Sequence, residues 1–273
     1  MADRYVFTVS DRTGITAESL GISLLCHFPS LQFKTVALPF VDTPEKARDA
    51  VRKINEACDR IGARPLIFAT LADDEIREII ASGNGVLFDL FDHFLAPLER
   101  ELGLESEHSI GSSHGVLNPN KYTARISALN FTMRTDDGMN ANHYDHAELV
   151  IVGVSRTAKT PTSLYLALHY GVSTANFPLL EEDLERARLP DKIIRHRQKL
   201  FGLTIDPEML RQIRQARYDK GKYAQLRQCE YEVTQAEALY RRERIPFVNT
   251  TAKSVEEIAT TILHKVNLNR DLM

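Results

Sequence analysis

Residues 148–168 of the chain read ELVIVGVSRTAKTPTSLYLAL, an apolar run followed directly by a polar loop and an amphipathic segment. This order predicts a strand, a phosphate-binding loop and a helix. Gly153, Lys159 and Thr160 match fixed positions of the Walker A pattern G-x-x-x-x-G-K-[ST], and the flanking strand and helix supply the context that the pattern requires. Backbone N–H groups of such a loop, backed by the N-terminus of a helix, form a concave site for anions.

The loop therefore predicts a nucleotide site, in which Lys159 would place a point charge on the terminal phosphate and the Thr160 hydroxyl would be a ligand of Mg²⁺. Ala158 departs from the pattern, because that position normally holds a glycine that takes positive φ and lets phosphate approach closely. The alternative is an ordinary strand-to-helix connection that contains a lysine with a buried stem. The predicted nucleotide-binding residues are Gly153, Val154, Ser155, Arg156, Thr157, Ala158, Lys159 and Thr160.

Length and composition indicate an ordinary globular protein of two domains. The chain has 273 residues, whereas single domains cluster near roughly 100 to 150 residues. Hydrophobic residues make up 43% of the chain and charged residues 26%, the usual balance of a soluble protein. The formal net charge is −3, so no global field favours nucleic acid or a membrane surface as a partner.

The sequence also predicts a cytoplasmic protein. Its beginning runs directly into the apolar residues 5–9 without the pattern of a signal peptide, and the uncharged stretch 160–180 contains prolines and polar residues that exclude a membrane span. Cys26, Cys58 and Cys229 are odd in number and far apart, which is typical of a reducing compartment.

Short apolar strands alternate with helices before the loop, which predicts a parallel α/β sheet with helices on its faces. The predicted strands span 5–9, 33–40, 64–70 and 85–89, and the predicted helices span 17–27, 44–61, 73–81 and 91–102. After the loop, strands are predicted at 172–177, 199–206 and 245–249, and Ser254-x-x-Glu257 is a capping box that opens a last helix. We therefore expect an N-terminal parallel α/β domain over residues 1–105 and a P-loop kinase-like α/β domain over residues 147–273.

Between these domains, apolar periodicity fades, and residues 106–146 predict a connecting segment that carries functional loops. The paired aspartates of Asp136–Gly138 could bind a metal or act as a general base, although an Asp-Asp-Gly sequence is more commonly only a turn. His143, Asp145 and His146 lack a convincing metal spacing, so we expect solvated polar residues there.

A row of arginines and the loop after the first predicted strand can each be interpreted in two ways. Arg211, Arg214 and Arg217 recur on one helical face, where they could close over phosphates or simply line a solvated surface. The loop 10–16 could recognise phosphate or a target protein, or be an ordinary connection with Thr16 as a helix cap.

The chain resembles the bacterial phosphoenolpyruvate synthase regulatory proteins, close relatives of the pyruvate, phosphate dikinase regulatory proteins, over nearly its whole length. The stretches that carry the resemblance are VSDRTGITAE at 9–18, LPFV at 38–41, LNPNKY at 117–122, DDG at 136–138, GVSRTAKTPTSLYLA at 153–167, KLFGLTIDP at 199–207 and YAQLRQC at 223–229.

The resemblance implies a bifunctional enzyme that acts on another enzyme. Such proteins use ADP to phosphorylate a threonine of the target synthase or dikinase, and they remove that phosphate with inorganic phosphate, releasing pyrophosphate. The family's nucleotide-binding loop maps onto residues 153–160. The stretches 124–128 and 226–229 look more like the branch that acts on phosphoenolpyruvate synthase, which we expect as the partner; a homodimer remains open.

With ADP in the loop, Lys159, Arg156 and Mg²⁺ would stabilise charge on the transferred phosphoryl group. The threonine hydroxyl needs a positioned carboxylate to accept its proton. Asp137 is the first candidate for this base, and Asp11 and Asp206 are the next.

Two rival functions remain. A conventional P-loop kinase or ATPase acting on a small molecule would prefer ATP and need no protein target. A regulatory module would hold nucleotide without turnover, and Ala158 is the feature that favours it.

Overall fold

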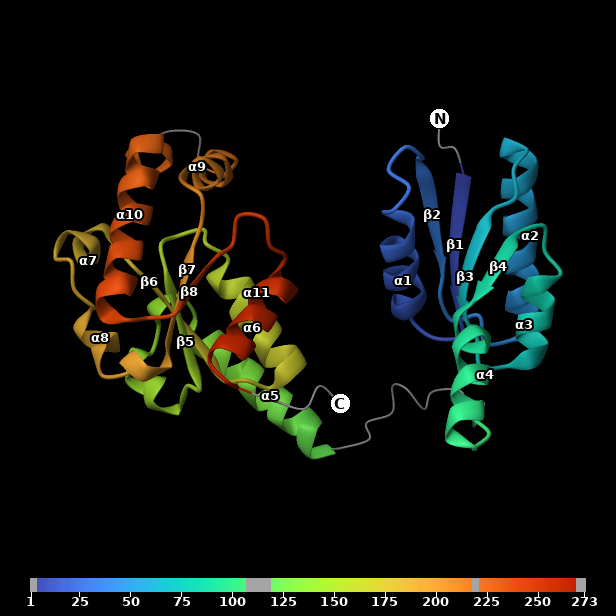
Figure 1. The fold of residues 1–273 in the computed structure, drawn as a ribbon, viewed down its shortest axis with the longest axis horizontal. Coiled ribbons are helices and arrows are strands. Elements are labelled where there is room, and N and C mark those ends of the chain that lie inside the picture. The colour runs from blue at the N-terminus through green and yellow to red at the C-terminus, as the bar shows by residue number, and fades with distance from the viewer. Residues whose placement is uncertain (1–3, 107–118, 218–220, 269–273) are drawn as a thin grey trace. The chain divides into compact units, whose positions relative to one another are not determined.

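The computed structural model describes residues 4–106, 119–217 and 221–268. The chain divides into two compact units, Met1–Gly115 and Val116–Met273. Each unit is built on a four-stranded parallel sheet with helices on its faces (Figure 1), so the predicted α/β class is confirmed. Among the described helices, none combines the length and the apolar character that crossing a bilayer requires.

The first unit alternates strands and helices as the sequence predicts. Its sheet has the order β2-β1-β3-β4. Helices α2 and α3 pack on one face through residues such as Ile54 and Ile76, and α1 and α4 pack on the other through Ala17 and Leu90. The elements are β1 (Arg4–Ser10), α1 (Ile15–Leu25), β2 (Phe33–Leu38), α2 (Pro44–Ile61), β3 (Leu66–Thr70), α3 (Asp74–Ala81), β4 (Val86–Asp89) and α4 (Leu90–Leu102).

Local sequence signals account for the ends of these helices. The Thr43 hydroxyl accepts a hydrogen bond from the Lys46 N–H at 3.3 Å, and Pro44 opens α2, as predicted. The prediction that Thr16 caps α1 is wrong, because Gly14 precedes the helix in a left-handed conformation with φ of 78° and Thr16 lies inside it. A glycine takes that conformation at little cost, so α1 begins at Ile15, two residues earlier than a cap at Thr16 would allow.

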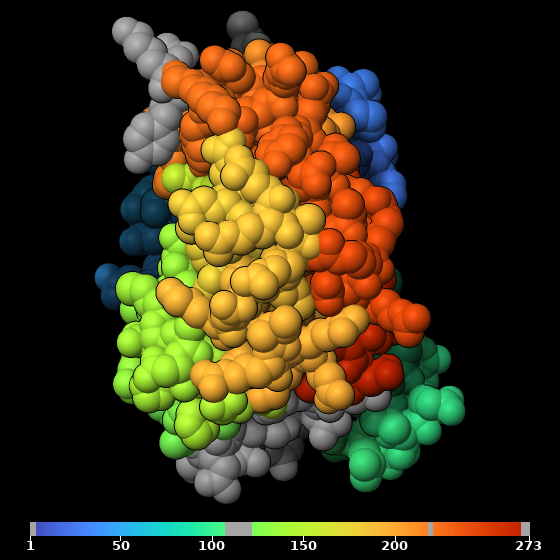
Figure 2. Space-filling model, turned by 90° about the vertical axis from the view of Figure 1, so that its left-hand side faces the viewer, coloured from blue at the N-terminus to red at the C-terminus, as the bar shows by residue number. Residues whose placement is uncertain are grey.

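The second unit repeats this architecture around the order β6-β5-β7-β8. Helices α6 and α11 cover one face, while α7, α8 and α10 cover the other, where the surfaces of α7 and α10 adjoin (Figure 2). The elements are α5 (Pro119–Arg134), η1 (Asp136–Gly138), η2 (Ala141–His146), β5 (Leu149–Gly153), α6 (Lys159–Tyr170), β6 (Thr174–Pro178), α7 (Glu181–Glu185), α8 (Asp191–Ile194), η3 (Arg197–Lys199), β7 (Leu200–Thr204), α9 (Pro207–Gln215), η4 (Lys222–Ala224), α10 (Leu226–Glu243), β8 (Phe247–Asn249) and α11 (Val255–Lys265). The predicted capping box of α11 is confirmed.

Strand order places the candidate site. Because β6 lies on one side of β5 and β7 on the other, the connections that leave β5 and β7 diverge at the carboxyl edge of the sheet. Crevices of this kind are where open α/β sheets bind ligands. The loop after β5 and the start of α9 after β7 both lie at this edge.

The segment 119–146 differs from the expected connecting segment, because it is largely helical and belongs to the second unit. Helix α5 packs along α6, and η1 lies against β6. Only a narrow part of α5 is buried, at Ala128 and Thr132, so its apolar periodicity was too weak to predict a helix. Residues 117 and 118 lie outside the described part of the chain.

Candidate functional site

The loop between β5 and α6 has the backbone of an anion cradle. Arg156 and Ala158 adopt left-handed conformations, with φ of 75° and 66°, among residues of ordinary conformation. Such alternation turns successive backbone N–H groups toward one concave side. The predicted nucleotide-binding residues, 153–160, run from the last residue of β5 through this loop into the first turn of α6.

Ala158 takes the positive φ that the pattern normally assigns to glycine. Its methyl group packs against the apolar cluster between the sheet and helices α6 and α11, which contains Ile151 and Ala259. Left-handed backbone costs an L-residue about 1 to 2 kcal/mol, and burial of one methyl group recovers roughly 0.8 kcal/mol. Packing of the partly buried methyl group therefore offsets part of the cost of this departure from the Walker pattern.

Lys159 is buried at the centre of the loop, with only 6% of its surface exposed. Its Nζ donates a hydrogen bond to the Val154 carbonyl oxygen at 3.1 Å. Burial lowers the pKa of Lys159 from 10.5 to about 8, against the opposing effect of the negative charges on Asp137 and Asp136. The ammonium group is thus poorly solvated in the unliganded loop. An anion that binds next to it would stabilise the charged form and raise the pKa of Lys159.

Proton uptake on binding should report this shift. At pH values just above 8, a polyphosphate bound in this loop would raise the pKa of Lys159, so its binding would take up protons and its affinity would fall as the pH rises further. Isothermal titration calorimetry in buffers of different ionisation enthalpy measures this uptake. The Lys159→Arg variant stays charged throughout and should show none; the same uptake in that variant would assign it to another group.

The lowered pKa of Lys159 also predicts how the stability of the folded protein depends on pH. Between about 8 and the ordinary value of 10.5, the unfolded chain holds more protons on Lys159 than the folded chain does. The contribution of Lys159 to the free energy of unfolding therefore increases with pH across this window in the unliganded protein.

Asp136 contacts the loop through Thr160. The Thr160 hydroxyl donates to Asp136 Oδ1 at 2.9 Å, and Asn176 Nδ2 donates to the same oxygen at 2.5 Å. Asn176 is fully buried on β6, so it holds the Asp136 carboxylate firmly beside the loop. The sequence pattern pointed to the pair of aspartates and favoured Asp137 as the base, and it did not indicate Asn176. A polar residue inside the predicted apolar strand 172–177 was the available signal.

Asp137 lies beside Asp136 but makes different contacts. Its backbone N–H donates to Asn176 Oδ1 at 3.0 Å, and its side chain is exposed near enough to Lys159 to favour the charged ammonium. Asp137 also has a left-handed backbone, with φ of 51°. Strained residues of this kind recur at functional sites, where the surrounding structure holds them in place.

Arg156 supplies a further donor to the loop. Within the described residues, its buried Nε has no hydrogen-bond partner. A buried donor of this kind carries a free-energy cost that an acceptor such as a phosphate oxygen would remove.

The three spaced arginines do not form a common row. Arg211 pairs with Glu208 one turn away, Arg217 is exposed, and Arg214 is completely buried. Both interpretations of the row are therefore wrong for Arg214, which neither faces solvent nor is free to close over phosphate. A spacing in sequence could not reveal this, because burial depends on what packs against the helix.

The other candidate acidic residues have structural contacts. The Asp206 carboxylate caps α9 by accepting from the Glu208 and Met209 N–H groups at 3.0 and 3.2 Å. Asp11 lies in the first unit, where its Oδ2 accepts from the Ala72 N–H at 3.2 Å. Each carboxylate thus already has a backbone partner.

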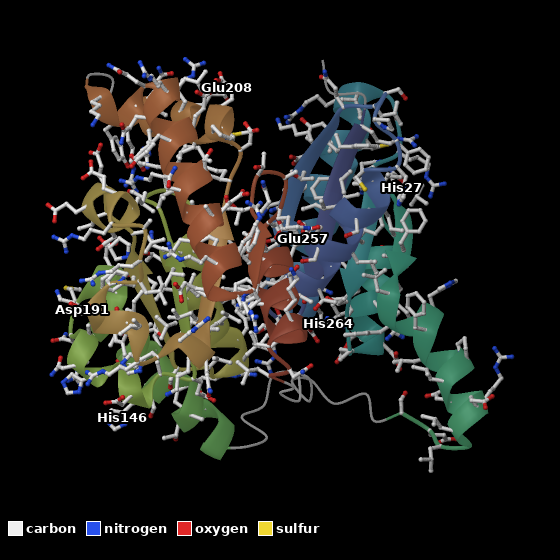
Figure 3. The ribbon with its side chains drawn as sticks, turned by 60° about the vertical axis from the view of Figure 1, so that its left-hand side comes forward. His27, His146, Asp191, Glu208, Glu257 and His264 are labelled. Atoms are coloured by element: carbon white, nitrogen blue, oxygen red, sulfur yellow. The ribbon has the colours of Figure 1, made fainter. Side chains whose placement is uncertain are left out.

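The histidine cluster lies away from the loop. His146 ends η2, just before β5, whereas the loop follows β5, and Figure 3 shows His146 at the opposite end of the unit from Glu208 of α9. Across the described ranges, no three His, Cys, Asp or Glu side chains gather as a metal site.

Comparison with known proteins identifies the family. The model of the kinase/pyrophosphorylase family matches residues 6–263. A protein from Alkalilimnicola ehrlichii is 51% identical over 271 residues, which cover 99% of this chain and 98% of that protein. A protein from Halorhodospira halophila is 52% identical over 268 residues, covering 98% of both chains. Both carry the provisional name phosphoenolpyruvate synthase regulatory protein. This chain therefore belongs to the kinase/pyrophosphorylase family.

Proposed function

We propose that this chain is a cytoplasmic, bifunctional protein threonine kinase and pyrophosphorylase that controls phosphoenolpyruvate synthase. In the kinase direction, the target threonine oxygen attacks the β-phosphorus of ADP, AMP leaves, and the hydroxyl proton passes to a base. In the other direction, an oxygen of inorganic phosphate attacks the phosphothreonine, pyrophosphate leaves, and the threonine oxygen regains a proton. Family membership and the names of the relatives support the reaction class and the target.

The observation that carries this proposal is the pairing of the anion cradle with Lys159 and with the hydrogen-bonded pair Thr160–Asp136. The cradle and Lys159 would bind the phosphates of ADP. Arg156 would contribute its unpartnered Nε to an equatorial oxygen of the transferred group. Together these donors would stabilise the charge that spreads over the phosphoryl oxygens in the transition state.

The residues at this site also fit Mg²⁺. Mg²⁺ prefers oxygen ligands and is commonly held by one or two protein groups together with substrate phosphates. The Thr160 hydroxyl and the Asp136 carboxylate, 2.9 Å apart, would supply those ligands. When bound, the ion would neutralise negative charge on the phosphates.

Asp137 is the proposed base. Its carboxylate is exposed, as a group that must meet a protein substrate has to be, whereas the Asp136 carboxylate is held by Thr160 and Asn176. In the kinase direction Asp137 would accept the threonine proton, and in the reverse direction it would return that proton to the threonine oxygen.

The test incubates the purified protein with histidine-phosphorylated phosphoenolpyruvate synthase and ADP labelled on its β-phosphate. Parallel arms use γ-labelled ATP and pyruvate, phosphate dikinase. Label on a synthase threonine from ADP alone supports the proposal. Label from ATP alone would favour a conventional P-loop kinase, binding without transfer would favour a nucleotide-holding regulator, and transfer only to the dikinase would change the target.

Replacing the proposed base should slow both directions. Asp137→Asn keeps the size of the side chain but removes the carboxylate, so we expect phosphorylation and phosphate-dependent dephosphorylation to fall about 10²-fold. Initial rates of label transfer measure this. Asp191→Asn, on an exposed side chain of α8 (Figure 3), is the matched control and should leave both rates unchanged. Full activity of Asp137→Asn would remove Asp137 as the base.

A further inference from the structure

Arg214 of α9 is a completely buried arginine next to the candidate site. Its side chain has no exposed surface, and it meets Glu232 of α10 with both terminal nitrogens: Nη2 lies 2.6 Å from Oε2 and Nη1 lies 3.2 Å from Oε1. Burying a charge is costly unless it is paired and hydrogen-bonded. The bidentate pair meets that requirement for the two terminal nitrogens, while Nε has no hydrogen-bond partner among the described residues. Because a buried ion pair adds little net stability, its presence calls for another explanation.

The remaining contacts of Arg214 connect this ion pair to the phosphate loop. Nη2 donates to the Ser155 carbonyl oxygen at 3.2 Å, and Nη1 donates to the Tyr223 carbonyl oxygen at 2.9 Å. The guanidinium lies 4.1 Å from the centre of the Tyr223 ring, and the Tyr223 hydroxyl donates to Ser155 Oγ at 2.9 Å. The carbonyl and the hydroxyl of Ser155 are therefore each held from outside the loop.

Holding the Ser155 carbonyl also orients the next N–H group. In a planar trans peptide, the C=O and the following N–H point in opposite directions. The Arg156 N–H must therefore point away from Arg214, and the left-handed backbone of Arg156 continues the turn of the cradle from there. A free peptide at this position could rotate, and the N–H would then have to be reoriented each time an anion bound.

We propose that Arg214, supported by Glu232 and Tyr223, is a positioning residue that presets the Ser155–Arg156 peptide for binding the phosphates of ADP. The inference rests on the proposed function, since it assigns the cradle to a nucleoside diphosphate. Arg214 acts through the peptide and does not itself contact phosphate, because its side chain, Nε included, has no exposed surface and its terminal nitrogens already bind Glu232, Ser155 and Tyr223.

The Arg214→Lys variant tests this role. Lysine keeps the positive charge for Glu232, but its single ammonium cannot reproduce the planar fork that reaches all three partners. We expect the Kd for ADP, measured by isothermal titration calorimetry with Mg²⁺ present, to rise about tenfold, as for the loss of a charge-assisted hydrogen bond. The Arg156 amide resonance, which should shift when ADP binds the wild-type protein, should shift less in the variant.

Arg211→Lys is the matched control, because Arg211 lies one turn earlier on α9 and pairs with Glu208 at the surface. It should bind ADP like the wild-type protein. Tyr223→Phe is a second variant that keeps the ion pair and the ring but removes the hydrogen bond to Ser155 Oγ, so we expect a rise of about threefold in Kd.

A merely structural role would lower the Tm of Arg214→Lys without changing the ADP affinity of the folded protein, and that result would overturn the inference. If Arg214→Lys does not fold, Tyr223→Phe decides: an unchanged Kd and an unchanged Arg156 resonance would overturn it, and a raised Kd would support it. Failure of the wild-type protein to bind ADP would instead overturn the proposed function, and the inference with it.

Discussion

Replacement of Lys159 by methionine is expected to reduce phosphoryl transfer to the target threonine by about 10³-fold while stabilising the unliganded protein. Activity falls because the variant has no cation to balance charge on the transferred phosphoryl group. Stability rises because the ammonium group is buried and its pKa is lowered to about 8, which shows that the folded protein disfavours the charge. Removing that cost should add about 1 to 3 kcal/mol to the free energy of unfolding at neutral pH.

Two measurements check this result together: the initial rate of label transfer from ADP, and the midpoint of urea unfolding without nucleotide. Lys192→Met, at an exposed position on α8, is the control and should change neither quantity. A variant that loses stability along with activity would show that Lys159 serves the fold, and a variant that keeps its activity would exclude it from phosphate binding.

Substitution of Gly153 by alanine is expected to disrupt the loop through a direct clash. A Cβ atom at this position would lie 2.7 Å from Thr157 Oγ1 and 2.8 Å from the Leu203 carbonyl oxygen. Thr157 is itself buried, with its hydroxyl bonded to the Val154 carbonyl, and the Leu203 oxygen belongs to the backbone of β7. Neither neighbour moves without distorting the cradle or the sheet, so we expect a loss of about 3 kcal/mol in stability.

Differential scanning calorimetry should show this loss as a fall in Tm of about 6 to 12 °C, and ADP binding should be lost at temperatures where the variant is still folded. Gly103→Ala is the control. It adds a Cβ in open space at the end of α4, where only the positive φ of 63° is unfavourable, so it should cost about 1 kcal/mol. If Gly153→Ala were as mild as this control, the close approach of β5, β7 and the loop would not be required.

Much of the fold could be predicted because its signals are local. The alternation of short apolar strands and helices predicted the sheets, and Thr43 and Ser254 marked helix starts that their side chains do cap. Helix α5 was not predicted, because most of its described residues are exposed and its sequence therefore lacks a clear apolar periodicity. The cradle was also predictable, because a strand, a loop and a helix that follow one another in sequence remain together in space.

What surrounds the cradle could not be predicted in the same way. Asp136 and Asp137 are adjacent in the sequence, and nothing in their spacing shows that they differ. In the structure, Thr160 and Asn176 hold the Asp136 carboxylate, whereas Asp137 is exposed. Asp206 was a candidate base, yet its carboxylate caps α9.

The sequence by itself determined the α/β class, the strand, loop and helix of residues 149–170 and the family resemblance, because each of these depends on short stretches whose physical preferences are local. Tertiary structure alone decided the partners of that loop. Asn176 meets Asp136 across 40 positions, and Arg214 meets Ser155 across 59. Such contacts depend on the order of strands in the sheet, which brings the ends of β5, β6 and β7 to one edge and thereby gives Asp136 and Arg214 their different surroundings.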